Sequence, residues 1–192
     1  MTSHSRAFPV ARALPVLLVF LAHSPAMGQV SVANDTCATA YGPVGAGFYD
    51  VDMTGATESG VQPVGLPPFV HSQTPGTACD DYGTPGIELH LSLDLWLEFT
   101  PALDRAYGFS TCNSATWNSK LAIYSGTCGN LIALACNDSG LACHNQASQL
   151  LSPPLSAGTN YLIQIGSFNH LDPGGTANLH IADIPPIPAN DD

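Results

Sequence analysis

Short runs that alternate apolar and polar residues recur along the chain from residue 47 onward. Residues 93–100 give the clearest example, because leucine or phenylalanine fills every second position and Trp96 falls on the opposite face, beside Asp94 and Glu98. A period of two is typical of a β-strand with one buried face. No long window shows a sustained helical period, so the pattern predicts an all-β domain.

Seven further segments carry a strand pattern: residues 47–53, 107–111, 120–125, 131–136, 149–151, 160–166 and 176–182. Residues 131–136 are almost entirely apolar, which is typical of a strand buried on both faces. Turn-forming residues separate the runs, as at 125–130. Short strands joined by such turns predict an antiparallel β-sandwich, jelly-roll-like in arrangement, over residues 29–183.

Residues 59–90 differ from the rest, because they contain five prolines and many glycines but no strand pattern. A loop longer than about 15 residues is uncommon in a compact domain and is often functional. We therefore expect a long loop here, pinned to the sandwich by a disulfide at Cys79.

The N-terminus has the layout of an export signal. Two arginines precede an apolar run at 13–22, and small residues follow at 24–28. The run is too short to span a bilayer, which takes about 20 residues. We expect residues 1–28 to be a signal peptide that is removed, so that the mature protein starts at Gln29 and is secreted or held at the cell surface.

The C-terminal residues 184–192 form a proline-rich tail, typical of an extended linker. Its last four residues, Ala-Asn-Asp-Asp, echo the Ala-Asn-Asp-Thr at 33–36. Two interpretations stay open: a chance match, or the start of another copy of the same module in a tandem array.

Charge is scarce and one-sided. All 15 acidic residues lie after residue 28, where the only Lys and Arg residues are Arg105 and Lys120, so the mature net charge is 2 − 15 = −13. Nucleic acid and anionic lipid need cationic partners. The composition therefore excludes a nucleic-acid-binding role, and no second apolar stretch is long enough to span a membrane.

Six cysteines in an exported chain predict disulfides. We favour the sequential pairs Cys37–Cys79, Cys112–Cys128 and Cys136–Cys143, because short loops close at the least entropic cost. A zinc site is the rival interpretation, but the chain contains no Cys-x-x-Cys pair and no histidine at finger spacing.

Catalytic motifs are missing from the sequence. There is no Gly-x-Ser-x-Gly, no His-Glu-x-x-His and no glycine-rich phosphate loop. Asp94 and Glu98 share a strand face, but their Cα atoms would lie about 13 Å apart at about 3.3 Å per residue, too far for a glycosidase pair. We therefore expect no catalytic residues.

Aromatic side chains offer a surface for a sugar ring. Trp117 lies in a polar stretch between two predicted strands, so we expect it to be exposed and to be the best candidate for ligand binding. Trp96 is a better candidate for packing, and acids in turns offer oxygen atoms to calcium.

Four segments, in order, resemble the bacterial pre-peptidase C-terminal (PPC) domain. Residues 34–40 resemble its opening Asn-Asp and small-residue stretch, and residues 94–100 are similar to its Asp-x-Trp/Tyr-x-Phe-Thr strand. Residues 121–126 and 157–163 resemble two later strands of that family. The Cys-Asn-Asp at 136–138 resembles a cysteine-rich branch found in secreted multi-domain proteins.

The resemblance covers about residues 33–183 and implies a β-sandwich that accompanies extracellular enzymes or surface proteins. Some members bind calcium near the domain start, and the matching positions here are Asn34, Asp35 and Asp94. The acids that often flank those positions are replaced by 31–33 and 91–93, which contain none, whereas calcium takes six to eight oxygens.

The leading hypothesis is a secreted, non-catalytic binding or accessory module that contacts an extracellular glycan, the matrix or a partner protein, with calcium as the implied cofactor. The alternatives are a structural spacer in a cell-surface array and a small hydrolase of an unrecognised type.

Overall fold

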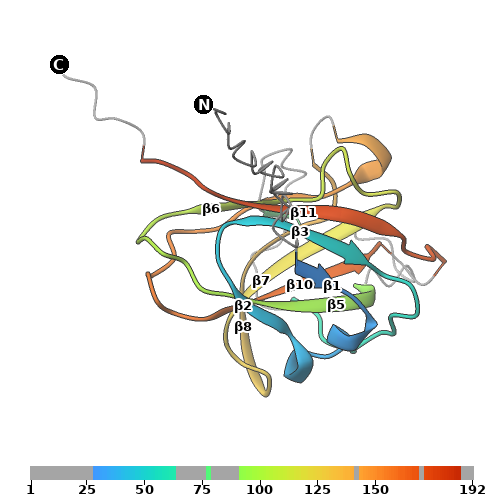
Figure 1. Cartoon of the computed structure of the whole chain (residues 1–192), viewed down its shortest axis with the longest axis horizontal. Coiled ribbons are helices and arrows are strands. Elements are labelled where there is room, and N and C mark those ends of the chain that lie inside the picture. Colours follow the sequence, from blue (N-terminus) through green and yellow to red (C-terminus); the bar gives the residue numbers. More distant parts are fainter. Residues whose placement is uncertain (1–27, 64–76, 79–90, 141–142, 169–170, 187–192) are drawn as a thin grey trace, which may run out of the picture.

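The chain folds into two β-sheets that stack face to face, as the sequence pattern predicts (Figure 1). The computed structural model describes residues 28–63, 77–78, 91–140, 143–168 and 171–186. Apart from Gly28, the predicted signal peptide lies outside these residues, as do most of the 59–90 loop and residues 187–192 of the tail.

The first sheet has five strands in the order β1-β3-β11-β6-β9. These strands are β1 (Gly28–Val30), β3 (Gly47–Asp52), β11 (Thr176–Asp183), β6 (Tyr107–Ser110) and β9 (Gln149–Leu151). β11 pairs antiparallel with both β3 and β6 and so forms the centre of this sheet.

The second sheet has six strands in the order β2-β5-β10-β7-β8-β4. These strands are β2 (Tyr41–Val44), β5 (Ser92–Phe99), β10 (Tyr161–Ser167), β7 (Ser119–Thr127), β8 (Asn130–Asn137) and β4 (Thr77–Ala78). Three single-turn 3-10 helices complete the described elements: η1 (Val32–Asn34), η2 (Cys37–Thr39) and η3 (His144–Gln146).

All eight predicted strands are present, and the structure adds β1, β2 and β4. Each added strand pairs in parallel with its neighbour, so the sheets are mixed rather than purely antiparallel. These strands are only two to four residues long. Such short segments carry too few positions for an alternating pattern to be visible in the sequence.

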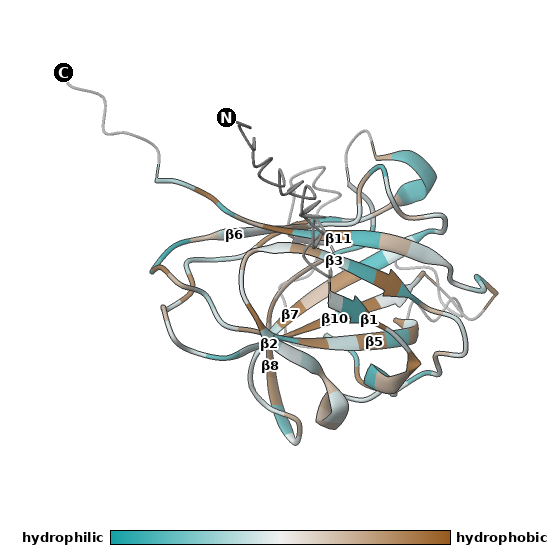
Figure 2. Cartoon of the chain, in the orientation of Figure 1, coloured by the Kyte–Doolittle hydropathy of each residue, from teal (hydrophilic) through white to brown (hydrophobic). Residues whose placement is uncertain are grey.

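The main core lies between the sheets, where every second residue of the long strands points inward. Leu95, Leu97 and Phe99 of β5 face Leu179 and Ile181 of β11 in one cluster of buried residues. Figure 2 shows hydrophobic and hydrophilic residues alternating along β11, whose buried residues are the apolar ones.

The outer face of the six-stranded sheet is also covered. Trp96 and Tyr124 lead a second buried cluster, packed beneath Cys37, Ala40 and Val61 from the segments that cross it. β10 is consequently buried along its whole length. The prediction that residues 131–136 form the strand buried on both faces is wrong, because Ile132 in β8 is 58% exposed.

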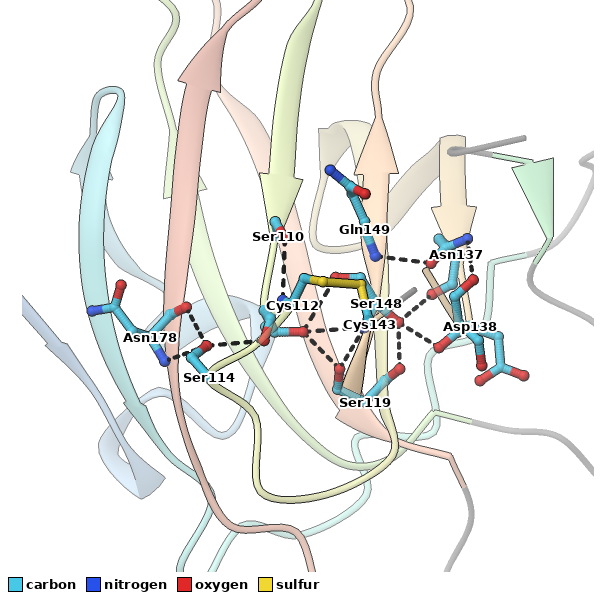
Figure 3. Close-up of a disulfide and its surroundings, with 12 residues drawn as sticks. Ser110, Cys112, Ser114, Ser119, Asn137, Asp138, Cys143, Ser148, Gln149 and Asn178 are labelled. Atoms are coloured by element: carbon cyan, nitrogen blue, oxygen red, sulfur yellow. Dashed lines mark hydrogen bonds between the residues drawn. A yellow bond between two sulfur atoms is a disulfide. The ribbon is translucent and has the colours of Figure 1, made fainter. Parts of the chain in front are cut away.

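A buried polar seam joins the two sheets at one end (Figure 3). The Ser148 hydroxyl lies within hydrogen-bond distance of the carbonyl oxygens of Ser119, Asn137 (3.0 Å) and Asp138 (2.6 Å). The Ser148 backbone N–H donates to the hydroxyls of Thr111 (3.2 Å) and Ser119 (3.0 Å). The seam thus connects the ends of β6 and β9 to β7 and β8, and it satisfies polar groups that would otherwise be buried without partners.

The cysteines pair differently from the sequential scheme. The structure contains Cys37–Cys128 and Cys112–Cys143, and Cys136 is disulfide-bonded as well. All three predicted pairs are therefore wrong.

Strand geometry explains the error. β7 has nine residues and so extends about 30 Å, which carries Cys128 to the opposite end of the sandwich from Cys112. Cys136 belongs to the cluster on the outer face of the six-stranded sheet, whereas Cys143 packs against the main core. The strands therefore hold the cysteines that are closest in sequence too far apart to form the predicted disulfides.

Within the described part of the chain, no helix has both the length and the apolar character needed to cross a membrane.

Candidate functional site

The residues predicted to bind calcium fasten a loop instead. The Asn34 side chain accepts a hydrogen bond from the Ser31 backbone N–H (3.1 Å) and donates to the Thr39 carbonyl (2.9 Å). The two Asp35 carboxylate oxygens accept from the backbone N–H (2.6 Å) and hydroxyl (2.5 Å) of Thr57. These contacts hold the N-terminal turns against the segment that follows β3.

Asp94 makes the same kind of contact with Ser59, which lies two residues after Thr57 in the chain. Its carboxylate accepts from the backbone N–H (2.7 Å) and hydroxyl (2.5 Å) of Ser59, and from the Gln164 side-chain amide (2.6 Å). Asp94 is completely buried.

Two aromatic residues complete the surroundings of Asp94. The Tyr124 hydroxyl donates to the Gln164 side-chain oxygen (2.6 Å), which fixes the orientation of that amide. The buried Trp96 indole N–H makes no hydrogen bond of good geometry, but it lies close enough to the Asp94 carboxylate to favour its charge. Burial nevertheless raises the pKa of Asp94, and the donors from Ser59, Gln164 and Trp96 offset this only in part.

These contacts do not fit a calcium site. The Asp35 and Asp94 oxygens already face N–H and O–H donors, whereas calcium requires six to eight oxygen ligands free of competing protons. Among the described residues, no three His, Cys, Asp or Glu side chains form a group suited to a metal. Calcium binding stays a prediction from the sequence that this geometry does not favour.

Trp117 is not on the surface. Its side chain is only 4% exposed and belongs to the main core, and its indole N–H donates to the Gly166 carbonyl (3.5 Å). The expectation of an exposed ring is therefore wrong, because the polar residues around Trp117 line the end of the sandwich while the ring turns inward.

Glu98 and Asp94 do not form a paired site. Asp94 faces the segment at 57–62, whereas Glu98 accepts a hydrogen bond from the Asn160 side chain. Glu98 and Asn160 line an open hollow of about 340 Å³ next to the Cys37–Cys128 disulfide. The two carboxylates therefore accept hydrogen bonds from different residues, although both lie on β5.

The outer face of the five-stranded sheet differs from that of the six-stranded sheet, which other segments of the chain cover. Among the described residues, no segment crosses it, and three of the seven large apolar side chains that are exposed belong to it: Phe48, Leu151 and Ile184. Leu151 and Ile184 line one hollow together, whereas Phe48 lies on β3, on the other side of β11. Exposed apolar patches of this kind can mark interaction sites.

A ring stack stands at the centre of this face. Phe48 of β3 and His180 of β11 are cross-strand partners, and their rings are parallel within 4°, with centroids 4.2 Å apart. Both side chains are exposed, Phe48 by 53%. An aromatic pair that remains this exposed offers flat apolar surface to a ligand.

Two open hollows lie on this face, and His180 of the stack lines one of them. One, of about 360 Å³, is mostly apolar and is lined by Gly108, Leu151, Ala182 and Ile184, together with neighbouring residues of β6, β9 and β11. The other, of about 450 Å³, has a mixed polar and apolar lining, which includes Gln29, Asp50, Asp52 and Asn178. Asp50 accepts a hydrogen bond from the Asn178 side chain (3.2 Å) across the strands.

The sequence contained a signal for this site. In residues 47–53 the alternation places Phe48 in phase with Asp50 and Asp52, on the polar face, so its exposure was predictable. His180 falls on the polar face of 176–182 in the same way. The pairing of the two strands, which brings Phe48 and His180 together, could not be read from either run alone.

No family model matches the sequence, and a search of curated proteins finds no relative. The PPC-like resemblance therefore stays a prediction.

Proposed function

We propose that this chain is a non-catalytic binding module of an exported protein and that it holds an extracellular ligand on the outer face of the five-stranded sheet. The observation that carries the proposal is the contrast between the two outer faces. The six-stranded sheet is covered by residues 37–40 and 57–63, whereas the five-stranded sheet presents the exposed Phe48–His180 stack and two hollows.

Burial energetics support this interpretation. Leaving an aromatic ring in water forgoes roughly 1.5–3 kcal/mol of the stabilisation that burial would supply. Nothing in the fold requires an aromatic residue at position 48, because its neighbours on the same face, Asp50 and Asp52, are polar. A binding surface gives a reason for the ring. The disulfides fit an oxidising compartment outside the cytoplasm.

The test is binding of the secreted, oxidised protein to three immobilised classes of material: neutral polysaccharides, acidic polysaccharides and matrix proteins. The double variant Phe48→Ala with His180→Ala removes the stack. Ile132→Ala is the matched control, because Ile132 is equally exposed but lies on β8 of the other sheet.

We expect at least one class to retain the native protein and the control but not the double variant. Retention that the double variant leaves unchanged, or no retention by any class, would contradict the proposal and favour a structural spacer.

A further inference from the structure

We infer that the ligand of this face is an uncharged polysaccharide chain that lies along β11, an inference that rests on the proposed function. Residues 176, 178, 180 and 182 of β11 alternate outward, and Ile184 continues the row. From Thr176 to Ile184 the row spans about 26 Å at about 3.3 Å per residue. This length fits several sugar units in line rather than a single terminal sugar.

The hollows have the shape that an extended chain requires. Both are open at the surface, and they follow one another along β11: His180 and Ala182 line the apolar hollow, while Asn178, the preceding outward position, lines the other. A ligand that ended on this face would call for one closed pocket around its terminus. Two open hollows in line instead allow a chain to enter at one end and leave at the other.

The chemistry of the face matches a sugar chain. A pyranose ring has apolar C–H faces and hydroxyl groups around its edge. The ring stack and the hollow beside Leu151 supply apolar contact, while Gln29 and Asn178 supply amide groups. Only one Asp50 oxygen accepts the bond from Asn178, which leaves its other oxygen for a hydroxyl donor. An apolar body with a few placed polar groups is the usual composition of a ligand site.

Charge disfavours the acidic glycans. Among the described residues, no lysine or arginine lines either hollow, and two carboxylates line the second one. These carboxylates outnumber the single α-amino group that removal of the predicted signal peptide would create at Gln29, so sulfated or uronate chains would meet net negative charge there, and like-charge juxtaposition costs several kcal/mol. An uncharged chain meets no such penalty.

Gly108 is the position that keeps the apolar hollow open. A Cβ atom placed there would meet only the Ile184 side chain at 3.5 Å and the Ala182 carbonyl at 4.0 Å, which are ordinary contacts. Its φ is not in the left-handed region, so the backbone does not require glycine. A valine at this strand position should therefore fold as well as glycine does, or better, while its side chain fills the hollow.

The experiment measures affinity for neutral oligosaccharides, from disaccharide to hexasaccharide, in the gluco-, xylo-, manno- and N-acetylchito- series. Heparin and alginate serve as acidic probes, and collagen serves as a protein probe. The proteins are the native chain, Gly108→Val, the Phe48→Ala/His180→Ala double variant and the Ile132→Ala control.

We expect one neutral series to bind roughly tenfold or more tightly at hexasaccharide than at disaccharide, with no dependence on salt. Gly108→Val should lose this binding by a similar factor while its melting temperature is kept or raised, a separation that a purely structural role for Gly108 would not produce. Ile132→Ala should bind as the native protein does.

Other outcomes separate this inference from the proposed function. Affinity already complete at the disaccharide, or stack-dependent binding of heparin, alginate or collagen in place of neutral chains, overturns the inference and leaves the face as the binding surface. Binding to any of these probes that the double variant does not change, or no binding at all, overturns both.

Discussion

Ser59 donates two hydrogen bonds to Asp94, one from its backbone N–H and one from its hydroxyl, and thereby fixes a loop segment over a buried carboxylate. Thr57 makes the same pair of contacts with Asp35. Residues 57–59, which follow β3, are therefore held twice in the same manner, once near the surface and once in the interior.

This repeat predicts unequal effects of two conservative substitutions. In Asp94→Asn, the new NH₂ group must face either the Ser59 N–H or the Gln164 amide, and both are donors. In Asp35→Asn, the NH₂ can face the Thr57 hydroxyl, which can also accept. We expect Asp94→Asn to lower the free energy of unfolding by about 1–3 kcal/mol and Asp35→Asn by clearly less. Urea denaturation of both variants checks this, and equal losses would contradict the assigned contacts.

The burial of Asp94 also predicts a dependence on pH. Burial raises its pKa in the folded state above the ordinary value, so the folded protein binds its proton more readily than the unfolded chain does. The stabilising contribution is therefore fully present below the ordinary pKa and is lost as pH rises through the raised one. We expect the stability of the native protein, relative to Asp94→Asn, to increase as pH falls from 7 toward about 4. Urea midpoints of the two proteins at a series of pH values measure this difference. A difference that grows in the opposite direction would show that the hydrogen bonds outweigh the burial.

Calcium provides a third test, because the contacts of Asp35 and Asp94 argue against the predicted site. A ligand that binds only the folded state raises its melting temperature as the ligand concentration increases. We expect the melting temperature of the secreted, oxidised protein to be the same in excess calcium and in excess chelator. A saturable rise with calcium that Asp35→Asn removes would restore the site that the sequence resemblance implies.

The sequence predicted those parts of the fold that depend on local patterns. Leu95 and Leu97 alternate with Trp96 along one strand, and β5 buries them on opposite faces as expected. The contacts of Asp94 were not predictable, because Ser59 and Gln164 lie 35 and 70 residues away in the chain. An acidic residue in a strand is usually expected to face solvent. Only the position of the segment with Ser59 shows that Asp94 is covered. The exposure of Trp117 was predicted wrongly for a similar reason. Its polar neighbours indicate that the backbone lies at the surface, but they do not indicate which way the ring points.

The disulfides provide the last test, because their connectivity was the largest error of the sequence interpretation. Peptide mapping of the unreduced protein should recover Cys37 linked to Cys128 and Cys112 linked to Cys143. The two bonds enclose 91 and 31 residues, so the chain-entropy model assigns them about 4–5 and about 3–4 kcal/mol. Paired serine substitutions should therefore destabilise the protein more when they remove Cys37–Cys128 than when they remove Cys112–Cys143. The reverse order would show that the Cys112–Cys143 bond stabilises the folded state directly, through the buried seam around Ser148 that it adjoins (Figure 3).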